Sequence, residues 1–163
     1  MYEYGKLQNL LKQLDLEALG QLLDSPAFYY ADKNISSLVE IGGGMGENAI
    51  VFLHVLRRPF IYTYIELNKA KCDRFTQIVK PYLESYGVMV RVLCEDAKKV
   101  ELPYADLILV DIEGYEDEDL IKRVRNSSKY SFICIHGYKK VNLSYCKPLF
   151  VNVPEVCYAC ENE

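Results

Sequence analysis

Short apolar segments that alternate with stretches of helical periodicity constrain the fold of this chain more than any other feature of its sequence. The apolar segments occupy residues 37–41, 60–65, 88–93, 105–110 and 130–135. Strands that are apolar along their whole length and alternate with helices are typical of a parallel sheet covered on both faces. The sequence therefore predicts an α/β fold. The expected helices cover residues 47–56, 68–86 (with Pro81 as a kink or an early end) and 116–125.

The two ends of the chain depart from this alternation. Residues 149–153 and 156–160 are β-rich and are separated only by Pro154 and Glu155, a spacing that predicts an antiparallel hairpin at the edge of the sheet. Before Ser25-Pro26, which breaks the pattern, leucines at helical spacing predict two short amphipathic helices, the second capped by Asp15. We expect these helices to pack on the main domain, with a lid over a pocket or a dimer contact as alternatives.

A length of 163 residues suits one compact domain and is too short for two ordinary ones. We divide it into an N-terminal helical extension (1–30), a core (36–136) and a C-terminal edge hairpin (137–163). The N-terminus lacks the basic start and apolar stretch of a secretory signal, and no apolar run approaches the roughly 20 residues that span a bilayer. We therefore expect a cytoplasmic protein without a membrane partner.

Polar or glycine-rich residues follow all five predicted core strands. They are Glu40 near the end of the first strand, the glycine-rich loop 42–46, Glu66, Asp96, Asp111, Glu113 and His136. Ligands of open α/β sheets bind at the carboxyl ends of the strands. A purely structural scaffold has no need of such a pattern, so we expect a functional site at this edge.

The segment from Val39 to Gly46 resembles the first motif of class I S-adenosylmethionine-dependent methyltransferases. The matching residues are Glu40, Gly42, Gly44 and Gly46. Glycines let the backbone turn sharply and approach a ligand closely, and the helix that follows offers free amides. An acidic residue nearby suits the cationic sulfonium and amino groups of the cofactor.

Two further positions fit this resemblance. Glu66 follows Gly46 by 20 residues, where an acceptor can bind both ribose hydroxyls. Asp96-Ala97 resembles the family's adenine-contacting motif, which implies that the Asp96 carboxylate accepts from the adenine amino group and that the Ala97 amide meets the ring. The structural alternatives are a solvated helix cap for Glu66 and a turn residue for Asp96.

The resemblance covers about residues 36–136. It implies S-adenosyl-L-methionine as the cofactor and a Rossmann-like class I methyltransferase sheet, mostly parallel with an antiparallel C-terminal edge hairpin and helices on both faces. Residues 36–136 would then form a cofactor-binding core.

The segment from Leu109 to Glu116 is similar to the Asp-hydrophobic-Glu-Gly-aromatic-Glu signature of FkbM-type methyltransferases. The strand from Phe132 to His136 is similar to that family's apolar strand ending in histidine. The likeness implies methyl transfer to a hydroxyl group of a small molecule or sugar. This chain lacks the proline that usually follows the acid at Glu66, and it is shorter between its third and fourth strands and after His136, which leaves the substrate class open.

Asp111, Glu113 and His136 are the candidate catalytic and acceptor-binding groups. Methyl transfer needs an aligned nucleophile and often a base, and histidine has the most suitable ordinary pKa near neutral pH. His136 as a purely structural histidine is the alternative. A divalent metal held by the three residues is a further alternative, but the favoured interpretation has no metal.

The charge balance disfavours nucleic acid as a partner. The net charge is −4, and phosphate contacts need a clustered basic surface. The sequence also lacks the Asn/Asp-Pro-Pro-aromatic and Pro-Cys motifs of base-modifying methyltransferases. We expect a small-molecule acceptor. The N-terminal helices and the C-terminal hairpin are the candidate contacts of a homodimer, and the sequence leaves the oligomeric state open.

Two other functions compete with methyl transfer. An NAD-dependent oxidoreductase is one, because residues 44–49 fit a loose dinucleotide motif and Glu66 has the spacing of a ribose acid. Against it, Glu47 would repel a pyrophosphate, Asp96, Asp111 and Glu113 go unexplained, and there is no second domain for a substrate. The other is a module that binds S-adenosylmethionine or a partner without turnover, which the short chain favours.

The six cysteines fall below the density of a disulfide scaffold. Cys157 and Cys160 form a CxxC pair, but on a strand residues three apart point to opposite faces, which argues against a zinc clip. Cys134 is expected in the core. An intracellular disulfide is expected only in a hyperthermophile.

Overall fold

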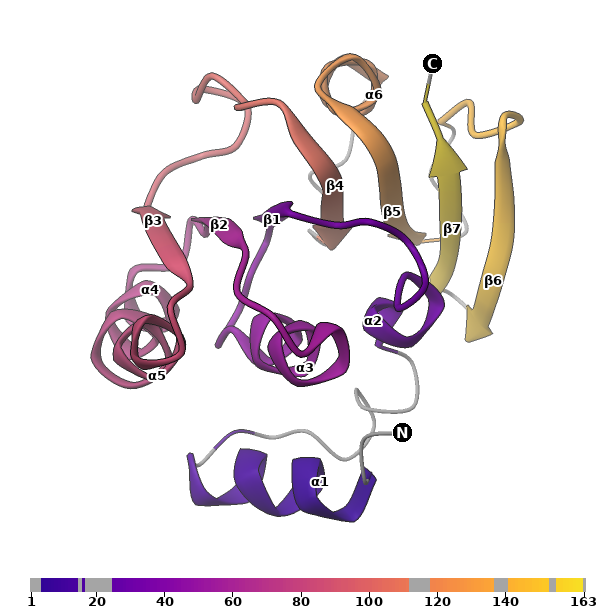
Figure 1. The fold of residues 1–163 in the computed structure, drawn as a ribbon. Helices are drawn as coiled ribbons and strands as arrows, with labels where there is room; N and C mark the ends of the chain where they lie inside the picture. Colours follow the sequence, from indigo (N-terminus) through magenta and orange to yellow (C-terminus); the bar gives the residue numbers. More distant parts are fainter. Residues whose placement is uncertain are drawn as a thin grey trace.

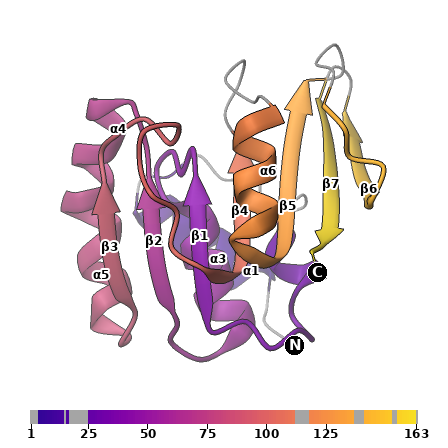
Figure 2. The ribbon, with the colours of Figure 1, turned by 90° about the horizontal axis from the view of Figure 1, so that it is seen from above.

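The computed structural model describes residues 4–14, 16, 25–111, 118–136, 141–152 and 155–162, without the side chains of Tyr4, His136 and Asn152. Its centre is one seven-stranded sheet with the order β3-β2-β1-β4-β5-β7-β6 (Figure 2). The strands are β1 (Ser37–Ile41), β2 (Ile61–Ile65), β3 (Met89–Leu93), β4 (Ala105–Asp111), β5 (Ser128–His136), β6 (Cys146–Asn152) and β7 (Glu155–Glu161). All five predicted core strands are present, within two residues of the expected limits.

The strand directions confirm the predicted fold class. Strands β1 to β5 pair in parallel, whereas β7 is antiparallel to both β5 and β6. The predicted C-terminal hairpin therefore forms one edge of the sheet. Although β7 comes after β6 in the chain, β7 lies next to β5 and β6 is the edge strand.

The chain reverses its direction across the sheet at β1. It runs outward from β1 to β2 and β3, then returns to place β4 on the other side of β1. In open α/β sheets this reversal leaves a crevice beyond the carboxyl ends of the strands. The crevice lies here beyond the ends of β1 and β4.

Helices cover both faces of the sheet (Figure 1). They are α1 (Tyr4–Gln13), α2 (Pro26–Tyr29), α3 (Glu47–Leu56), α4 (Lys69–Arg74), the π-helical turn η1 (Phe75–Val79), α5 (Lys80–Ser85) and α6 (Glu118–Asn126). One buried cluster includes residues of α1, α3 and α5, and a second, on the opposite face, includes residues of α6. Among the residues that the structure describes, no helix combines the length and apolar character needed to cross a membrane.

The helical stretch predicted over 68–86 does not end at Pro81. It continues through Pro81 because the π-helical turn comes first, in which the Lys80 N–H bonds to the carbonyl of Phe75, five residues earlier. Pro81 has no N–H to give to the preceding turn, and at the second position of α5 it needs none. The predicted early end at Pro81 is therefore wrong, and an irregular π-helical turn comes directly before α5.

The N-terminal prediction is confirmed for the first helix, and most of the second helix lies outside the described residues. Leu7 and Leu11 of α1 are fully buried in the first core cluster, so α1 packs on the main domain as expected. The second predicted helix, with Asp15 as its cap, lies outside the described residues except for Leu16. Ser25 has an extended backbone and starts a new short helix, α2, because its hydroxyl accepts from the Ala27 N–H at 3.3 Å.

All six cysteines are paired in disulfides, which corrects the expectation drawn from their low density. The pairs are Cys72–Cys94, Cys134–Cys157 and Cys146–Cys160. Cys134 is buried as predicted, but it is bonded across the β5–β7 pair. Cys157 and Cys160 belong to different core clusters, so they face opposite sides of the sheet, as the spacing predicts.

Candidate functional site

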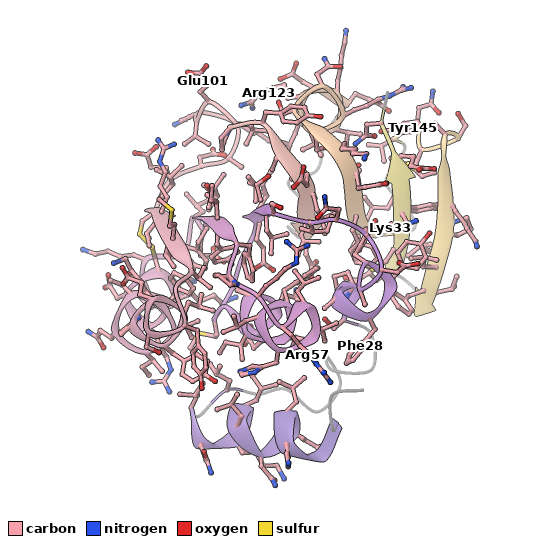
Figure 3. The ribbon with its side chains drawn as sticks, in the orientation of Figure 1. Phe28, Lys33, Arg57, Glu101, Arg123 and Tyr145 are labelled. Carbon is pink, nitrogen blue, oxygen red and sulfur yellow. A yellow bond between two sulfur atoms is a disulfide. The ribbon has the colours of Figure 1, made fainter. Side chains whose placement is uncertain are left out.

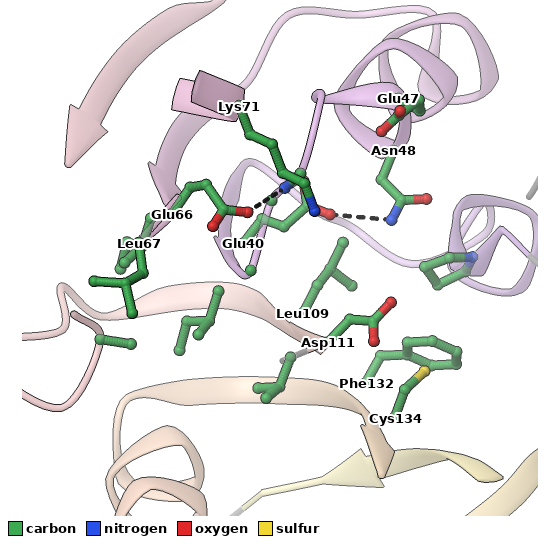
Figure 4. Close-up of a pocket in the computed structure, with 18 of the residues that line it drawn as sticks. Glu40, Glu47, Asn48, Glu66, Leu67, Lys71, Leu109, Asp111, Phe132 and Cys134 are labelled. Atoms are coloured by element: carbon green, nitrogen blue, oxygen red, sulfur yellow. Dashed lines mark hydrogen bonds between the residues drawn. The ribbon is translucent and has the colours of Figure 1, made fainter. Parts of the chain in front are cut away.

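A pocket of about 770 Å³ lies at the carboxyl ends of the parallel strands (Figure 4). We call the side formed by Glu95, Asp96 and Ala97, which follow β3, the β3 end. We call the side formed by Asp111, Phe132, Cys134, Glu155 and Cys157 the β7 end. Residues 42–44 of the glycine-rich loop line the pocket between these ends, because β1 lies between β3 and β7 in the sheet.

The glycine-rich loop is held from below by strand β2. The Gly44 N–H donates to Glu66 Oε1 at 2.9 Å, and the Gly44 carbonyl accepts from the Tyr64 hydroxyl at 2.6 Å. The Tyr64 ring stacks on Phe75, with the ring centroids 3.8 Å apart. Gly44 has a φ of +57° and Gly46 one of +88°, a left-handed conformation that favours glycine. The protein's own contacts therefore hold the loop in this conformation.

Glu66 is 9% exposed and reaches into the pocket from the end of β2. Its Oε1 binds the Gly44 N–H, and its Oε2 accepts from the Asn68 N–H at 2.9 Å. Each carboxylate oxygen has a second lone pair, so Glu66 can still accept from two neighbouring ligand hydroxyls. Asn68, not Glu66, caps helix α4, through its own side chain on the Lys71 N–H.

Glu40 is buried beneath the loop, with 3% of its surface exposed. The Tyr62 hydroxyl donates to its Oε1 at 2.6 Å, and Asn48 Nδ2 donates to its Oε2 at 3.0 Å. Burial raises the pKa of the Glu40 carboxyl to about 8, although both hydrogen bonds favour the charged form. A cation placed in the pocket would offset this burial cost and draw out the charged form.

The β3 end contains both residues assigned to the adenine. Ala97 is buried, and Asp96 is half-buried with its Oδ1 accepting from the Lys98 N–H at 3.0 Å. Asp96 is therefore a turn residue, as the structural alternative holds, and it also lines the pocket. The two roles are compatible, because a carboxylate has lone pairs for more than one donor.

The three candidate catalytic residues are described unequally. Asp111 is the last residue of β4, is exposed and lines the pocket. Glu113 lies outside the described residues. His136 is the last residue of β5, but its side chain lies outside the described part. The assignment of Glu113 and His136 to the site stays a prediction.

Sequence reasoning missed several lining residues. They are Asn48, Leu67, Lys71, Phe132, Cys134, Glu155 and Cys157. The sequence could have indicated Asn48, which lies in the first helical turn after the glycine-rich loop, and Leu67, which directly follows Glu66. Cys134 had a weaker signal, two residues before His136 on the same strand. Glu155 and Cys157 had none, because only the pairing of β5 with β7 brings them here.

The lining is strongly acidic. Among the described residues it contains seven carboxyl groups: Glu40, Glu47, Glu66, Glu95, Asp96, Asp111 and Glu155. Lys71 is the one basic residue in the same described set (Figure 4). Such a pocket attracts a ligand that carries positive charge and repels a polyanion.

Arg123 of α6 supports the β3 end from outside the pocket. Its guanidinium donates to the carbonyls of Ala97 at 3.2 Å and Lys98 at 3.3 Å, and also to that of Val100. Figure 3 shows Arg123 on the same side of the sheet as Glu101, which belongs to the segment between β3 and β4. Arg123 therefore fixes the path of the chain just after Asp96.

Replacing Arg123 with glutamine is expected to lower the free energy of unfolding by about 1–3 kcal/mol, because a charge-assisted donor to several carbonyls is lost. Denaturant unfolding measures this change. Lys122→Gln is the matched control, since Lys122 is exposed on the same helix, and its effect should stay within about 0.5 kcal/mol. Equal losses in the two variants would contradict the bracing role.

Comparisons with known proteins support the fold. The sequence matches no protein-family model, and a search of curated proteins finds no match. A candidate methylase from Haemophilus influenzae has a TM-score of 0.65 at 12% identity, over 88% of this chain and 97% of that protein. A candidate caffeoyl-CoA O-methyltransferase from Staphylococcus aureus has a TM-score of 0.63 at 13% identity, over 97% and 91% of the two chains.

TrmK from M. capricolum, solved with S-adenosylhomocysteine, has a TM-score of 0.54 at 11% identity, over 84% of this chain and 69% of that one. At these identities the similarity shows the fold alone. The chain has the Rossmann-like fold of these methyltransferase structures.

Proposed function

We propose that this protein is an S-adenosyl-L-methionine-dependent methyltransferase that acts on a hydroxyl group of a small molecule or sugar. The observation that carries the proposal is the acidic pocket built around a glycine-rich loop, with Glu66 braced against that loop at 2.9 Å. The volume of about 770 Å³ lies within the usual range of small-ligand pockets. The solved structures support the proposal through their shared fold.

The residues present fit this cofactor. Glu66 would accept from the ribose hydroxyls, Asp96 and Ala97 would meet the adenine, and Leu67, which is 56% exposed beside the pocket, offers apolar surface to the ring. Glu40 lies under the loop, where its carboxylate would attract the cationic part of the ligand. When bound, the cofactor supplies an electrophilic methyl group on a sulfonium.

The β7 end is where we place the acceptor. Asp111 lines the pocket there at the end of β4, and it can accept a proton or hydrogen bond from an acceptor hydroxyl. The resemblance of residues 109–116 to FkbM-type proteins supports a hydroxyl as the nucleophile, with Glu113 and His136 as further candidates. The acidic lining supports a small-molecule acceptor over a nucleic acid, whose phosphates it would repel.

The oxidoreductase alternative is disfavoured by the charge beside the loop. Glu47 begins α3 and lines the pocket, and a Cβ built on Gly44 would lie 3.9 Å from its carboxylate. A dinucleotide pyrophosphate binds at such a helix start, where this carboxylate would repel it.

Calorimetric titration with S-adenosylmethionine, S-adenosylhomocysteine and NAD tests the proposed methyltransferase function directly. Micromolar binding of the first two is expected, and binding of NAD alone would overturn it.

The raised pKa of Glu40 predicts a pH-dependent affinity for S-adenosylmethionine. Below about pH 8 the carboxyl is protonated in the free protein, so a cationic ligand must expel that proton to gain the attraction. The association constant should therefore rise with pH up to about 8 and then level off. Glu40→Gln should remove this rise. Subtracting the variant's profile from that of the wild type cancels the titration of the ligand's own amino group. Identical profiles would show that Glu40 does not face the cation.

Replacing Asp111 with asparagine distinguishes an enzyme from a binding module. In an enzyme, turnover should fall by about 100-fold or more, because the asparagine amide cannot take a proton. Cofactor affinity should change less than about threefold, since Asp111 lies away from the β3 end that binds the adenine. The test combines a methyl-transfer assay over hydroxylated acceptors with calorimetry. Loss of cofactor binding in this variant would overturn the division between the two ends of the pocket.

A further inference from the structure

Two cysteines and a carboxylate converge at the β7 end of the pocket. Cys134 of β5 and Cys157 of β7 lie directly opposite each other, with their Cα atoms 4.0 Å apart. Glu155 precedes Cys157 by two residues on the same strand, and its Oε1 lies 3.9 Å from Cys157 Sγ. A disulfide sulfur carries no hydrogen, so this is a contact between two potential ligand atoms rather than a hydrogen bond.

The spacing of these atoms suits one tetrahedral ion. One ligand atom from each of Cys134, Glu155 and Cys157 falls within a group whose members are all within 4.8 Å of one another. With Zn–S near 2.3 Å and Zn–O near 2.1 Å, tetrahedral angles require separations of about 3.6 Å between sulfur and oxygen and about 3.8 Å between sulfurs. The sulfur–oxygen distance is already close to this value. The two sulfurs need only separate by side-chain rotation once the bond between them is broken.

We propose that reduction of the Cys134–Cys157 disulfide creates a binding site for a thiophilic divalent cation of the Zn²⁺ class, with the two thiolates and the Glu155 carboxylate as ligands. In the reduction, a dithiol reductant supplies two electrons and two protons, the Cys134–Cys157 bond breaks, and the reductant becomes a disulfide. The cation then displaces the two thiol protons to solvent. The oxidised form has no thiolates and does not bind.

The chemistry of the three groups selects the ion. Thiolates favour Zn²⁺ and other soft ions over Mg²⁺ and Ca²⁺, which prefer oxygen ligands. Asp111, the register partner of Cys134 on β4, lines the same end of the pocket and adds negative charge next to the site. Three protein ligands leave a fourth position, and the ligands themselves line the pocket, so that position opens toward a bound molecule.

The site goes beyond the proposed methyl transfer and does not depend on it. Cation binding involves only the β7 end, whereas the cofactor assignment rests on the glycine-rich loop, Glu66 and the β3 end. Calorimetry with S-adenosylmethionine therefore tests one, and cation titration tests the other.

The test uses Co²⁺ as a probe, because thiolate ligation of Co²⁺ gives a charge-transfer absorption that oxygen ligands do not. The full chain is treated with a phosphine reductant, which does not compete for the ion as a thiol would, and is titrated with Co²⁺ and then with Zn²⁺. We expect the absorption to appear in the reduced protein with one Co²⁺ bound, to be lost as Zn²⁺ displaces it, and to be absent from the oxidised protein. Absence of the signal after reduction would overturn the proposal.

Matched variants locate the site. Cys157→Ser should abolish the signal, while Cys146→Ser should retain it, because Cys146–Cys160 is an equivalent cross-strand disulfide on the opposite face of the sheet. Glu155→Gln leaves every disulfide intact and should weaken Co²⁺ binding by about tenfold or more, since even indirect supporting groups cost that much in metal sites. If Cys157→Ser fails to fold, the Co²⁺ affinity of Glu155→Gln still tests whether Glu155 is a ligand of this site. Unchanged affinity in Glu155→Gln, or loss of the signal in Cys146→Ser, would contradict the proposed ligands.

Discussion

Replacing Glu66 with alanine is expected to weaken S-adenosylmethionine binding by at least about 100-fold. The variant loses two charge-assisted hydrogen bonds to the ribose, each worth about 1.5–3 kcal/mol. It also frees the Gly44 N–H and the Asn68 N–H, which hold the glycine-rich loop and the start of α4 in place. Calorimetric titration of the two proteins measures the difference.

The control for this variant is Glu101→Ala. Glu101 is an exposed carboxylate between β3 and β4 that does not line the pocket, so its removal changes the net charge equally and should leave affinity within about twofold. Similar losses in both variants would mean that long-range charge, and not the ribose contact, determines binding. Full affinity in Glu66→Ala would show that Glu66 does not bind the ribose of the cofactor.

Replacing Gly46 with alanine is expected to lower the free energy of unfolding by about 2–5 kcal/mol, the sum of backbone strain and overpacking. Gly46 has a φ of +88°, and a Cβ there would lie 2.6 Å from the Phe75 ring and 3.0 Å from Val79. Neither neighbour can retreat easily, because both are fully buried. Denaturant unfolding monitored by circular dichroism measures the loss.

Gly87 provides the matched control for this steric argument. It has the same φ of +88°, but a Cβ there would meet only Pro59 at an ordinary 3.6 Å. Gly87→Ala therefore reports the backbone strain alone and should cost about 1–2 kcal/mol. Equal costs at the two positions would show that the close approach of Gly46 to Phe75 and Val79 adds nothing to the cost.

The sequence predicted the sheet and one half of the pocket because both depend on local patterns. The apolar segment 37–41, which contains Glu40, and the glycine-rich loop after it indicate a strand and a turn without reference to the rest of the chain. Glu66 directly follows the next apolar segment, 60–65. The other half could not be predicted in the same way. Cys157 enters the pocket only through the register of β7 against β5, which neither strand encodes alone. The hydrogen bond from Arg123 to the Ala97 carbonyl likewise depends on tertiary packing, because the two residues are 26 positions apart in the sequence.

The register also explains why the cysteines were hard to interpret. The alternation of side chains correctly separates Cys157 from Cys160, but it does not name their partners. Cys134 and Cys146 become those partners because β7 lies between β5 and β6, an insertion that the order of the strands in the chain conceals.

The position of β7 between β5 and the edge strand β6 also sets an order of assembly during protein synthesis. Domains are synthesised from the N-terminus, so the segments that form the glycine-rich loop and the β3 end leave the ribosome well before Glu155 and Cys157. Until the C-terminal hairpin docks as a unit, β5 has an unpaired edge, and such edges recruit other chains. We therefore expect the interval between the emergence of β5 and that of β7 to be the stage of biogenesis at which this protein depends most on chaperones.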